Sequence, residues 1–219
     1  MRFYLRILVC FLFCLLVAGA GQARQIKVAW VPDGDTLILE DRETVRLKGI
    51  DAPETGYDGE QDQYFAREAT RNLVKLIAHQ ELILKTGPDS RDSHGRTLGY
   101  AYLPDGRNIS VLMVRQGYAF YYAHEDEDKD ISRRIHNAQK QAMKEGLGFW
   151  PEILSMDDRN DSELIYVGNI KSRRFHVIEC GYGQRISQAN RKEFSSLHDV
   201  FYQGYAPCRR CTPWPLMSD

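Results

Sequence analysis

Two short acidic segments of this 219-residue chain carry carboxylates at a spacing that suits metal chemistry. Residues 33–36 (Asp-Gly-Asp-Thr) form a turn sequence that leads into an apolar run, and residues 51–54 (Asp-Ala-Pro-Glu) follow the next such run. If the two runs pair as a hairpin, four carboxylates converge. Hard cations prefer carboxylate and carbonyl oxygens, and neither segment contains a histidine or cysteine that would favour a softer metal. The pattern predicts a calcium site.

Two arginines accompany these acids. Arg46 alternates with the apolar Val45 and Leu47, so its guanidinium should leave the strand on the side opposite the apolar pair. Arg96 follows the loop 92–95 and enters the next expected strand. A carboxylate-bound cation polarises a phosphate, and a planar guanidinium binds two of its oxygens as charge develops. The combination suits a reaction through a pentacovalent phosphate, with one carboxylate left to act on water.

A second group of possible metal ligands lies near the C-terminus. His176 and Cys180 are four residues apart, Cys208 and Cys211 form a Cys-x₂-Cys pair, and a spacer of 27 residues separates the two pairs. Four nitrogen and sulfur donors in two close pairs predict a tetrahedral structural zinc site. Two alternatives stay open: a redox-type Cys208–Cys211 disulfide, and a free Cys180 beside an unrelated histidine.

Hydrophobic periodicity predicts the elements that must position these residues. Strand-like runs occupy residues 36–39, 44–48, 81–84 and 97–103, and the turn sequence Pro-Asp-Gly at 104–106 after the last run indicates a second hairpin. Helical spacing covers residues 63–79, 110–116 and 131–144. We expect five short strands and three helices in all, which predicts a mainly β, α+β fold: a small closed barrel with helices packed outside it.

Composition and charge limit the class of protein. The chain has 29 basic and 30 acidic residues, with 43% hydrophobic residues, which excludes a uniformly basic coat protein, a disordered acidic tail and a multi-span membrane protein. Residues 25–152 carry 17 basic and 22 acidic side chains, whereas residues 164–219 carry 8 and 4. Two unlike parts are expected, joined by a polar, acidic linker at residues 152–163.

The first twenty residues are typical of a secretory signal peptide. Two arginines precede a charge-free run at residues 7–20, which ends in the A-x-A sequence Ala18-Gly19-Ala20, and cleavage is expected after residue 20 or 23. An uncleaved anchor is the weaker alternative, because about 20 apolar residues are needed to span a bilayer. Cleavage removes Cys10 and Cys14. We expect an exported, periplasmic or extracellular protein without stable membrane association.

Four motifs together resemble the staphylococcal nuclease (thermonuclease) family. They are Val-Pro-Asp-Gly-Asp-Thr at 31–36, Val-Arg-Leu-Lys-Gly-Ile-Asp-Ala-Pro-Glu at 45–54, Gly95-Arg96, and Val-Arg-Gln-Gly-Tyr-Ala at 114–119. The resemblance covers about residues 25–151. It implies an OB-fold barrel that hydrolyses DNA and RNA phosphodiesters with Ca²⁺ and leaves 3′-phosphates.

The resemblance also implies a role for each matching residue. Asp35 and Asp51 look like the metal carboxylates, and the backbone carbonyl of Ala52 looks like a further ligand. Glu54 looks like the residue that positions or deprotonates the attacking water. Arg46 and Arg96 look like the two arginines that bind the phosphate in the transition state.

Tyr121 or Tyr122 is expected to line the nucleotide pocket, with a place in the core as the alternative. Ser93 and His94 stand where the founding member has a Lys-Tyr pair that contacts a terminal phosphate. Whether the protein prefers to cleave at the ends of a nucleic-acid chain or within it is therefore left open.

Residues 164–215 resemble the small zinc domain of the bacterial adaptive-response DNA repair protein, which takes methyl groups from phosphotriesters. The matching residues are 166–176, Cys180 and 194–211. That domain binds zinc through four cysteines, the first of which accepts the methyl group. His176 takes the first place here, so methyl acceptance is not expected. What the resemblance implies is a zinc-bound, net-basic module.

We therefore expect a secreted Ca²⁺-dependent nuclease of DNA, RNA or both, with a zinc module that tethers it to nucleic acid. Zinc removal should unfold residues 164–215, while cleavage of a short oligonucleotide should persist. One alternative is a non-catalytic OB-fold protein that binds nucleic acid. The acids and arginines of the predicted site argue against it, because such a protein would keep the barrel and lose the metal carboxylates. The other is a zinc module that docks a protein.

Overall fold

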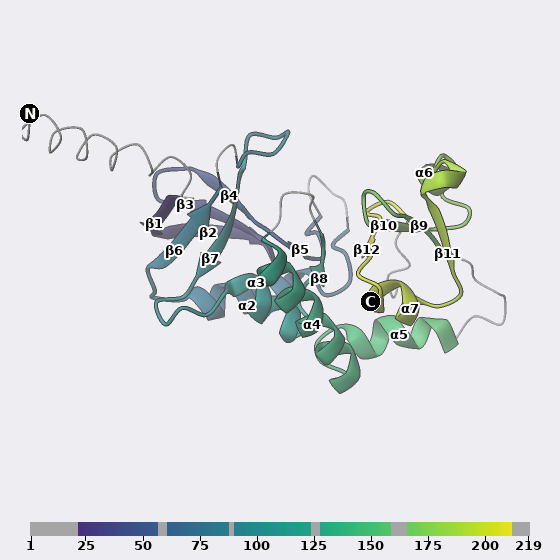
Figure 1. The fold of residues 1–219 in the computed structure, drawn as a ribbon. Coiled ribbons are helices and arrows are strands. Elements are labelled where there is room, and N and C mark those ends of the chain that lie inside the picture. Colours follow the sequence, from purple (N-terminus) through teal and green to yellow (C-terminus); the bar gives the residue numbers. More distant parts are fainter. Residues whose placement is uncertain (1–21, 57–60, 88–89, 124–127, 159–165, 212–219) are drawn as a thin grey trace, which may run out of the picture.

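The structure, a computed structural model, describes residues 22–56, 61–87, 90–123, 128–158 and 166–211 (Figure 1). The predicted signal peptide, with Cys10 and Cys14, lies outside these described residues. No helix within the described ranges is long and apolar enough to cross a membrane.

A curled six-stranded sheet dominates the N-terminal part (Figure 1). Its strands are β1 (Gln22–Ile26), β2 (Val28–Asp33), β3 (Thr36–Leu39), β4 (Thr44–Leu47), β6 (Leu82–Thr86) and β7 (Thr97–Tyr102). Their spatial order is β1-β6-β7-β4-β3-β2, and only β4 and β7 are parallel. The short strands β5 (Ile50–Asp51) and β8 (Phe120–Tyr121) form a separate antiparallel pair. The predicted α+β class is confirmed, but the expectation of five strands was too low. The two edge strands β1 and β2 and the short pair β5 and β8 lie outside the runs that the sequence indicated.

The predicted hairpin consists of β3 and β4. Thr36 lies opposite Arg46 and Leu37 opposite Val45 in the register. Leu37 and Val45 are fully buried, so their face of the hairpin packs into the core of the barrel. The hairpin thereby fixes the face on which the polar residues between these apolar positions emerge.

Helices α2 (Ala66–Ile77) and α3 (Ile109–Arg115) pack against this sheet, and α4 (Lys129–Glu145) packs on α3 and β8. They correspond to the three predicted helices with slightly different ends. Helix α2 buries Ala69 and Leu73, and α4 buries Ile135 and Ala138, as the 3.6-residue spacing predicts. Gly146 ends α4 with a φ of 62°, a left-handed conformation that glycine adopts without strain.

The C-terminal part is built on a second, four-stranded sheet. Its strands, in spatial order, are β11 (Arg191–Phe194), β9 (Tyr166–Asn169), β10 (Arg174–Val177) and β12 (Ala206–Pro207). Helices α6 (Gly181–Gln184) and α7 (Leu197–Tyr202) and the 3-10 turn η2 (Gln188–Asn190) connect the strands. We call residues 166–211 the C-terminal module.

The predicted linker at 152–163 is partly wrong, because residues 152–158 belong to helix α5 (Trp150–Asp158). Trp150 is fully buried and Ile153 is nearly so, which stabilises the helix through packing. The acidic Asp157 binds the N-terminus of α7, where its carboxylate accepts hydrogen bonds from Leu197 N (2.9 Å) and His198 N (3.2 Å). The acidic residues of this segment therefore include a helix cap, Asp157, as well as solvent-exposed side chains.

An aromatic core joins the two parts of the chain. The rings of Phe120 and Phe201 stack at 5.1 Å, and Trp150 meets Phe201 edge to face at 4.9 Å. Gln139 of α4 is fully buried, and its side chain donates to the carbonyl of Phe201 at 2.7 Å. The C-terminal module is therefore packed on the barrel through a shared core.

Candidate active site

The predicted site residues of the hairpin converge in the structure. Asp35 lies in the turn between β2 and β3, Arg46 in β4 and Asp51 in β5, and their exposed fractions are 2%, 6% and 3%. Arg46 forms an ion pair with Asp35 through Nη1, and its Nη2 donates to Asp51 Oδ1 at 2.8 Å. One buried guanidinium thus bridges the two predicted metal carboxylates.

Backbone groups fix the carboxylate of Asp35. The N–H of Ala52 donates to Asp35 Oδ2 at 2.6 Å, and the Thr36 hydroxyl donates to Oδ1 at 3.1 Å. The Leu47 N–H donates to the backbone carbonyl of Asp35 at 2.8 Å. The Ala52 N–H therefore holds this residue directly against Asp35. The metal-ligand role of the Ala52 carbonyl stays a prediction.

Gly34 permits this close approach between the turn and the residues that it contacts. A Cβ on Gly34 would lie 2.7 Å from the Cβ of Ala52 and 2.8 Å from the Cβ of Ala69 in α2. Both distances are far below van der Waals contact. The glycine of the Asp-Gly-Asp sequence is thus needed for packing, beyond its role in the turn.

We predict that Gly34→Ala destabilises the protein by about 1–3 kcal/mol, the usual cost of overpacking. It should also lower the rate of phosphodiester hydrolysis, because the shift displaces Asp35 and Ala52. Denaturant unfolding and a hydrolysis assay measure the two effects. Gly181→Ala is the matched control, since its added Cβ meets nothing within 4 Å and stability should change by at most about 0.5 kcal/mol. Equal stability of the two variants would contradict the packing argument.

Glu54 lies at the edge of this cluster, half-buried, and Gln63 holds its backbone. The Gln63 side chain accepts a hydrogen bond from Glu54 N at 2.8 Å, and Gln63 N donates to the Glu54 carbonyl at 2.9 Å. Burial raises the pKa of Glu54, with Asp33 and Asp51 adding to the effect. A carboxylate with a raised pKa is suited to proton transfer. Gln63 is a positioning residue that the sequence did not reveal.

The pKa values of the two buried aspartates, Asp35 and Asp51, are shifted in opposite directions. Burial raises the pKa of Asp35 well above its ordinary value, against the attraction of Arg46. Burial acts on Asp51 in the same sense, but three guanidiniums outweigh it and the pKa of Asp51 lies well below its ordinary value. Two of those three guanidiniums come from the C-terminal module.

Arg174 of β10 and Arg209, which follows β12, reach the carboxylates from the C-terminal module. Arg174 Nη1 pairs with Asp51 Oδ2. Arg209 Nη2 lies 2.8 Å from Asp51 Oδ1 and 2.7 Å from Glu54 Oε1. The sequence analysis counted both arginines only as part of a basic module. Their sequence positions, 123 and 158 residues away from Asp51, contain no local signal of this contact.

Arg96 has a different partner from Arg46. It precedes β7, the parallel neighbour of β4, and its Nε donates to Asp92 Oδ2 at 2.7 Å. The side chain is 27% exposed. Among the described residues, its ion pair is thus with Asp92, while Arg46 pairs with the buried aspartates. The predicted clamp role of Arg96 stays a prediction.

The two candidate tyrosines occupy different environments. Tyr121 is 8% exposed, its hydroxyl lies 2.7 Å from Ser132 Oγ, and its ring stacks on His136 at 4.8 Å. Packing thus favours the core alternative for Tyr121, because its ring and hydroxyl are both engaged. Tyr122 is half-buried, and the guanidinium of Arg174 lies 3.8 Å from the centre of its ring. Of the two, Tyr122 adjoins the carboxylate cluster.

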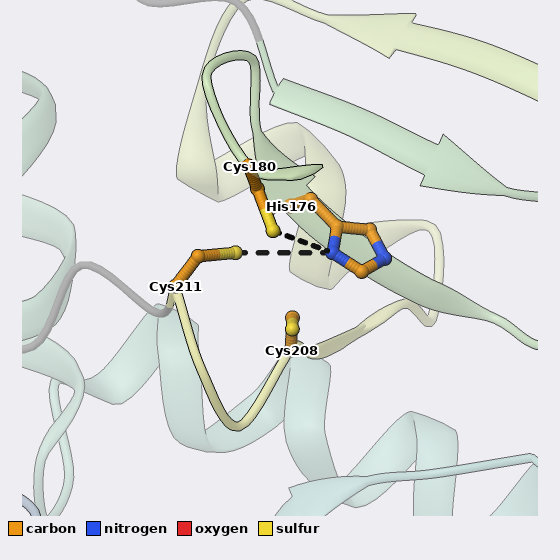
Figure 2. A group of neighbouring side chains, drawn as sticks. All are labelled: His176, Cys180, Cys208 and Cys211. Atoms are coloured by element: carbon orange, nitrogen blue, oxygen red, sulfur yellow. Dashed lines mark hydrogen bonds between the residues drawn. The ribbon is translucent and has the colours of Figure 1, made fainter. Parts of the chain in front are cut away.

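The four predicted zinc ligands come together in the C-terminal module (Figure 2). Their ligand atoms all lie within 4.8 Å of one another. His176 Nδ1 is 3.5 Å from Cys180 Sγ and 3.8 Å from Cys211 Sγ. A tetrahedral Zn²⁺ with bonds of about 2.3 Å to sulfur and about 2.0 Å to nitrogen separates its ligand atoms by about 3.5–3.8 Å. The donor set therefore fits zinc.

Two of the three cysteines, Cys180 and Cys208, have a lowered pKa, whereas the hydrogen bond with Cys208 raises the pKa of Cys211. Cys180, Cys208 and Cys211 are free thiols. A hydrogen bond from Cys211 lowers the pKa of Cys208 most, and His176 lowers it further against the effect of burial. A lowered pKa favours the thiolate, which is the form that binds metal.

Taken together, the small barrel and its buried carboxylate–arginine cluster define the class: a nuclease-type hydrolase. The chain belongs to the staphylococcal nuclease homologue family, whose model matches residues 44–152. The matched region begins at the first residue of β4, the strand that carries Arg46, and extends into the first turn of α5.

Curated relatives agree with this assignment. The chain is 34% identical over 137 residues to a micrococcal nuclease of Shigella flexneri, covering 58% of this chain and 73% of the relative. It is 33% identical over 123 residues to a thermonuclease of Staphylococcus intermedius, covering 55% and 72%. A longer match, 26% identity over 195 residues, covers 80% of this chain and 16% of endonuclease YhcR of Bacillus subtilis (strain 168).

Proposed function

We propose that this protein is a Ca²⁺-dependent nuclease that hydrolyses phosphodiester bonds of DNA, RNA or both and leaves 3′-phosphates. The observation that carries the proposal is the buried cluster in which Arg46 bridges Asp35 and Asp51. A non-catalytic OB-fold binder would have no use for two buried carboxylates, whose desolvation is costly. The relatives named as nucleases support the catalytic alternative.

The donor set suits calcium. Asp35, Asp51 and the carbonyl of Ala52 would hold the ion, all three through hard oxygen atoms. In the structure, guanidiniums balance the negative charge of the two carboxylates. A bound cation would contribute to the same charge balance. When bound, Ca²⁺ supplies a positive charge that polarises the phosphate and stabilises charge in the transition state.

The side chains of this protein perform the remaining steps. Arg46 presents a planar fork that binds the phosphate as its negative charge develops, and Arg96 contributes a second fork. Glu54 positions the attacking water or accepts its proton, and the raised pKa supports the second of these roles. Tyr122 is proposed to contact a nucleotide next to the scissile phosphate, and the Arg174 guanidinium 3.8 Å from the centre of its ring supports this.

We predict that Ca²⁺ restores hydrolysis to metal-depleted protein and that a Ca²⁺-selective chelator abolishes it. The assay is digestion of a plasmid and of an RNA transcript by purified mature protein, with end-labelling to identify the 3′-phosphate. Product ends with 5′-phosphates, or unchanged activity after verified removal of Ca²⁺, would contradict the proposal. Zinc added in place of calcium serves as the control, because it should not restore the rate.

The C-terminal module is proposed to bind one structural Zn²⁺ and to tether long nucleic acid. Exposed basic side chains on the module, Lys171, Arg185 and Lys192, support the second part. Their replacement by glutamine should weaken binding to long DNA at low salt. Each lost phosphate contact should reduce the slope of log K against log salt by roughly 0.9. A control with the exposed Lys75, Arg134 and Lys144 replaced should keep the slope, and an equal loss in both variants would refute a tether.

Export is proposed from the N-terminal charge pattern. Cleavage after residue 20 would retain all of strand β1 (Gln22–Ile26), which pairs with β6, whereas cleavage after residue 23 would remove its first two residues. We therefore favour the earlier site. Intact mass of the protein recovered from the periplasm or medium distinguishes the two sites, and recovery of full-length protein only from the cytoplasm would refute export.

A further inference from the structure

The C-terminal module delivers two guanidiniums to the carboxylate cluster of the barrel. Arg174 and Arg209 both bind Asp51, and Arg209 also binds Glu54. These two acids are a proposed metal ligand and the proposed residue for the attacking water. Both arginines lie outside the region that the family model matches. The module therefore adds cations to the site beyond those that the barrel supplies.

The module holds these arginines in defined positions. Arg174 Nη1 also donates to the carbonyl of Pro207 at 2.7 Å, and the ring of Tyr122 lies 3.8 Å from its guanidinium. Arg174 lies two residues before His176 on β10, and Arg209 directly follows Cys208. The Cys/His cluster thus fixes the backbone beside each arginine. Such preorganisation is typical of residues that bind a substrate at a fixed place.

Each guanidinium keeps donors for a further acceptor. A guanidinium carries five N–H groups in one plane. Within the described part of the chain, the hydrogen bonds of Arg174 use Nη1 and those of Arg209 use Nη2. The other N–H groups of both forks can bind the non-bridging oxygens of a phosphodiester.

Charge balance explains why the site benefits from these cations. Four acids and three arginines interact in the cluster: Asp33, Asp35, Asp51 and Glu54 with Arg46, Arg174 and Arg209. With all acids ionised their charges sum to −1, and a bound dication makes the sum +1. Without Arg174 and Arg209 the sum with the dication would be −1, which repels a phosphodiester.

We propose that Arg174 and Arg209 are substrate-binding residues of the active site and hold the phosphate at the scissile bond. The active site is then assembled from both parts of the chain. This inference rests on the proposed nuclease function and extends it to residues of the C-terminal module. The occupant is a phosphate ester of a nucleotide, bound by charge-assisted hydrogen bonds.

The test compares Arg174→Gln, Arg209→Gln and the double variant with Arg173→Gln and Arg210→Gln. The control residues are the exposed neighbours of the two arginines in sequence, so each control removes the same charge from the same segment. Titration calorimetry with thymidine 3′-monophosphate, with and without Ca²⁺, measures phosphate binding without turnover. Hydrolysis of bis(4-nitrophenyl) phosphate measures KM and kcat on a diester too small to contact a distant basic surface.

We expect Arg174→Gln and Arg209→Gln each to weaken nucleotide binding on the order of tenfold or more, and to raise KM for the small diester similarly. The two control variants should stay within about twofold of the unaltered protein. Thermal unfolding checks that the fold is kept. Arg209→Gln is the safer variant in this respect, because the Arg209 side chain is 43% exposed.

Three outcomes would overturn the inference. An increased kcat/KM would mean that the guanidiniums block the acids and inhibit the enzyme. Equality with the control variants would mean that the arginines do not bind substrate, and a loss confined to long DNA would mean that they act only as part of a tether. If the unaltered protein fails to hydrolyse either the diester or nucleic acid with Ca²⁺, the proposed function fails instead, whatever the variants bind.

Discussion

Cys208→Ser is expected to abolish zinc binding and to unfold the C-terminal module. Structural zinc supplies apparent binding free energies of about 10–16 kcal/mol, which small metal-bound domains use for folding. The module's own strands are short, since β12 has two residues and β10 has four. Cys208 follows β12 directly, and its N–H donates to the Phe175 carbonyl at 2.9 Å. Loss of the metal therefore releases β12 and the segment directly after it, which carries two of the proposed ligands, Cys208 and Cys211.

The shared core extends this effect to the barrel. Phe175 and Phe201 of the module pack with Phe120 and Trp150, so unfolding of the module exposes aromatic surface on the other part. Fully burying a large apolar side chain is worth about 1.5–3 kcal/mol, so we expect the barrel to lose stability as well. We also revise the expectation that short substrates are still cleaved, because Arg174 and Arg209 would leave the active site.

Native mass spectrometry should find one zinc in the unaltered protein and none in Cys208→Ser. Thermal unfolding and near-ultraviolet circular dichroism of Trp150 report the loss of the module and of the shared core. His198→Asn is the matched control, because His198 is exposed and lies outside the Cys/His cluster. A Cys208–Cys211 disulfide in a folded, zinc-free protein would replace the zinc interpretation by the redox alternative.

Arg46→Lys is expected to lower kcat by about 10²-fold or more. Arg46 uses two nitrogens of one plane to bind Asp35 and Asp51 together. The single ammonium group of lysine cannot bridge both carboxylates and also present a fork to the phosphate. Stability should fall too, because a buried ion pair that loses one partner costs about 3–5 kcal/mol, part of which lysine recovers.

The measurement is steady-state hydrolysis of the small diester at saturating Ca²⁺, together with denaturant unfolding under the same conditions. Arg107→Lys provides the control, since Arg107 is exposed in a turn of the same barrel and pairs only with Asp105 among the described residues. That variant should keep both kcat and stability. A loss in Arg46→Lys confined to KM would show that Arg46 docks substrate without stabilising the transition state.

Local chemistry in the sequence was sufficient for the α+β class, for the β3–β4 hairpin and for the expectation that Arg46 lies near the acids. Strand alternation placed Leu37 and Val45 in the core, and the β3–β4 register then brought Arg46 beside Asp35. The four members of the Cys/His cluster were also found from spacing alone, because each pair lies within a short segment. Such features depend on neighbours a few residues apart, which a sequence pattern records directly.

Only the tertiary structure decided how the two parts of the chain meet. Residues 152–158 form a helix rather than part of a linker because Trp150 and Ile153 are buried and Asp157 caps α7, which are contacts with distant residues. For the same reason nothing in the sequence separated Tyr121 from Tyr122.

The contacts of Asp51 illustrate the limit most clearly. The sequence by itself determined that Asp51 is an acid in a nuclease-like motif and that Arg174 and Arg209 are basic residues close in sequence to members of the Cys/His group. Packing of the module on the barrel decided that these charges meet, across 123 and 158 residues of chain. Ion pairs of this kind leave no periodicity or spacing in a sequence, since their energy depends on distance and burial in the folded state.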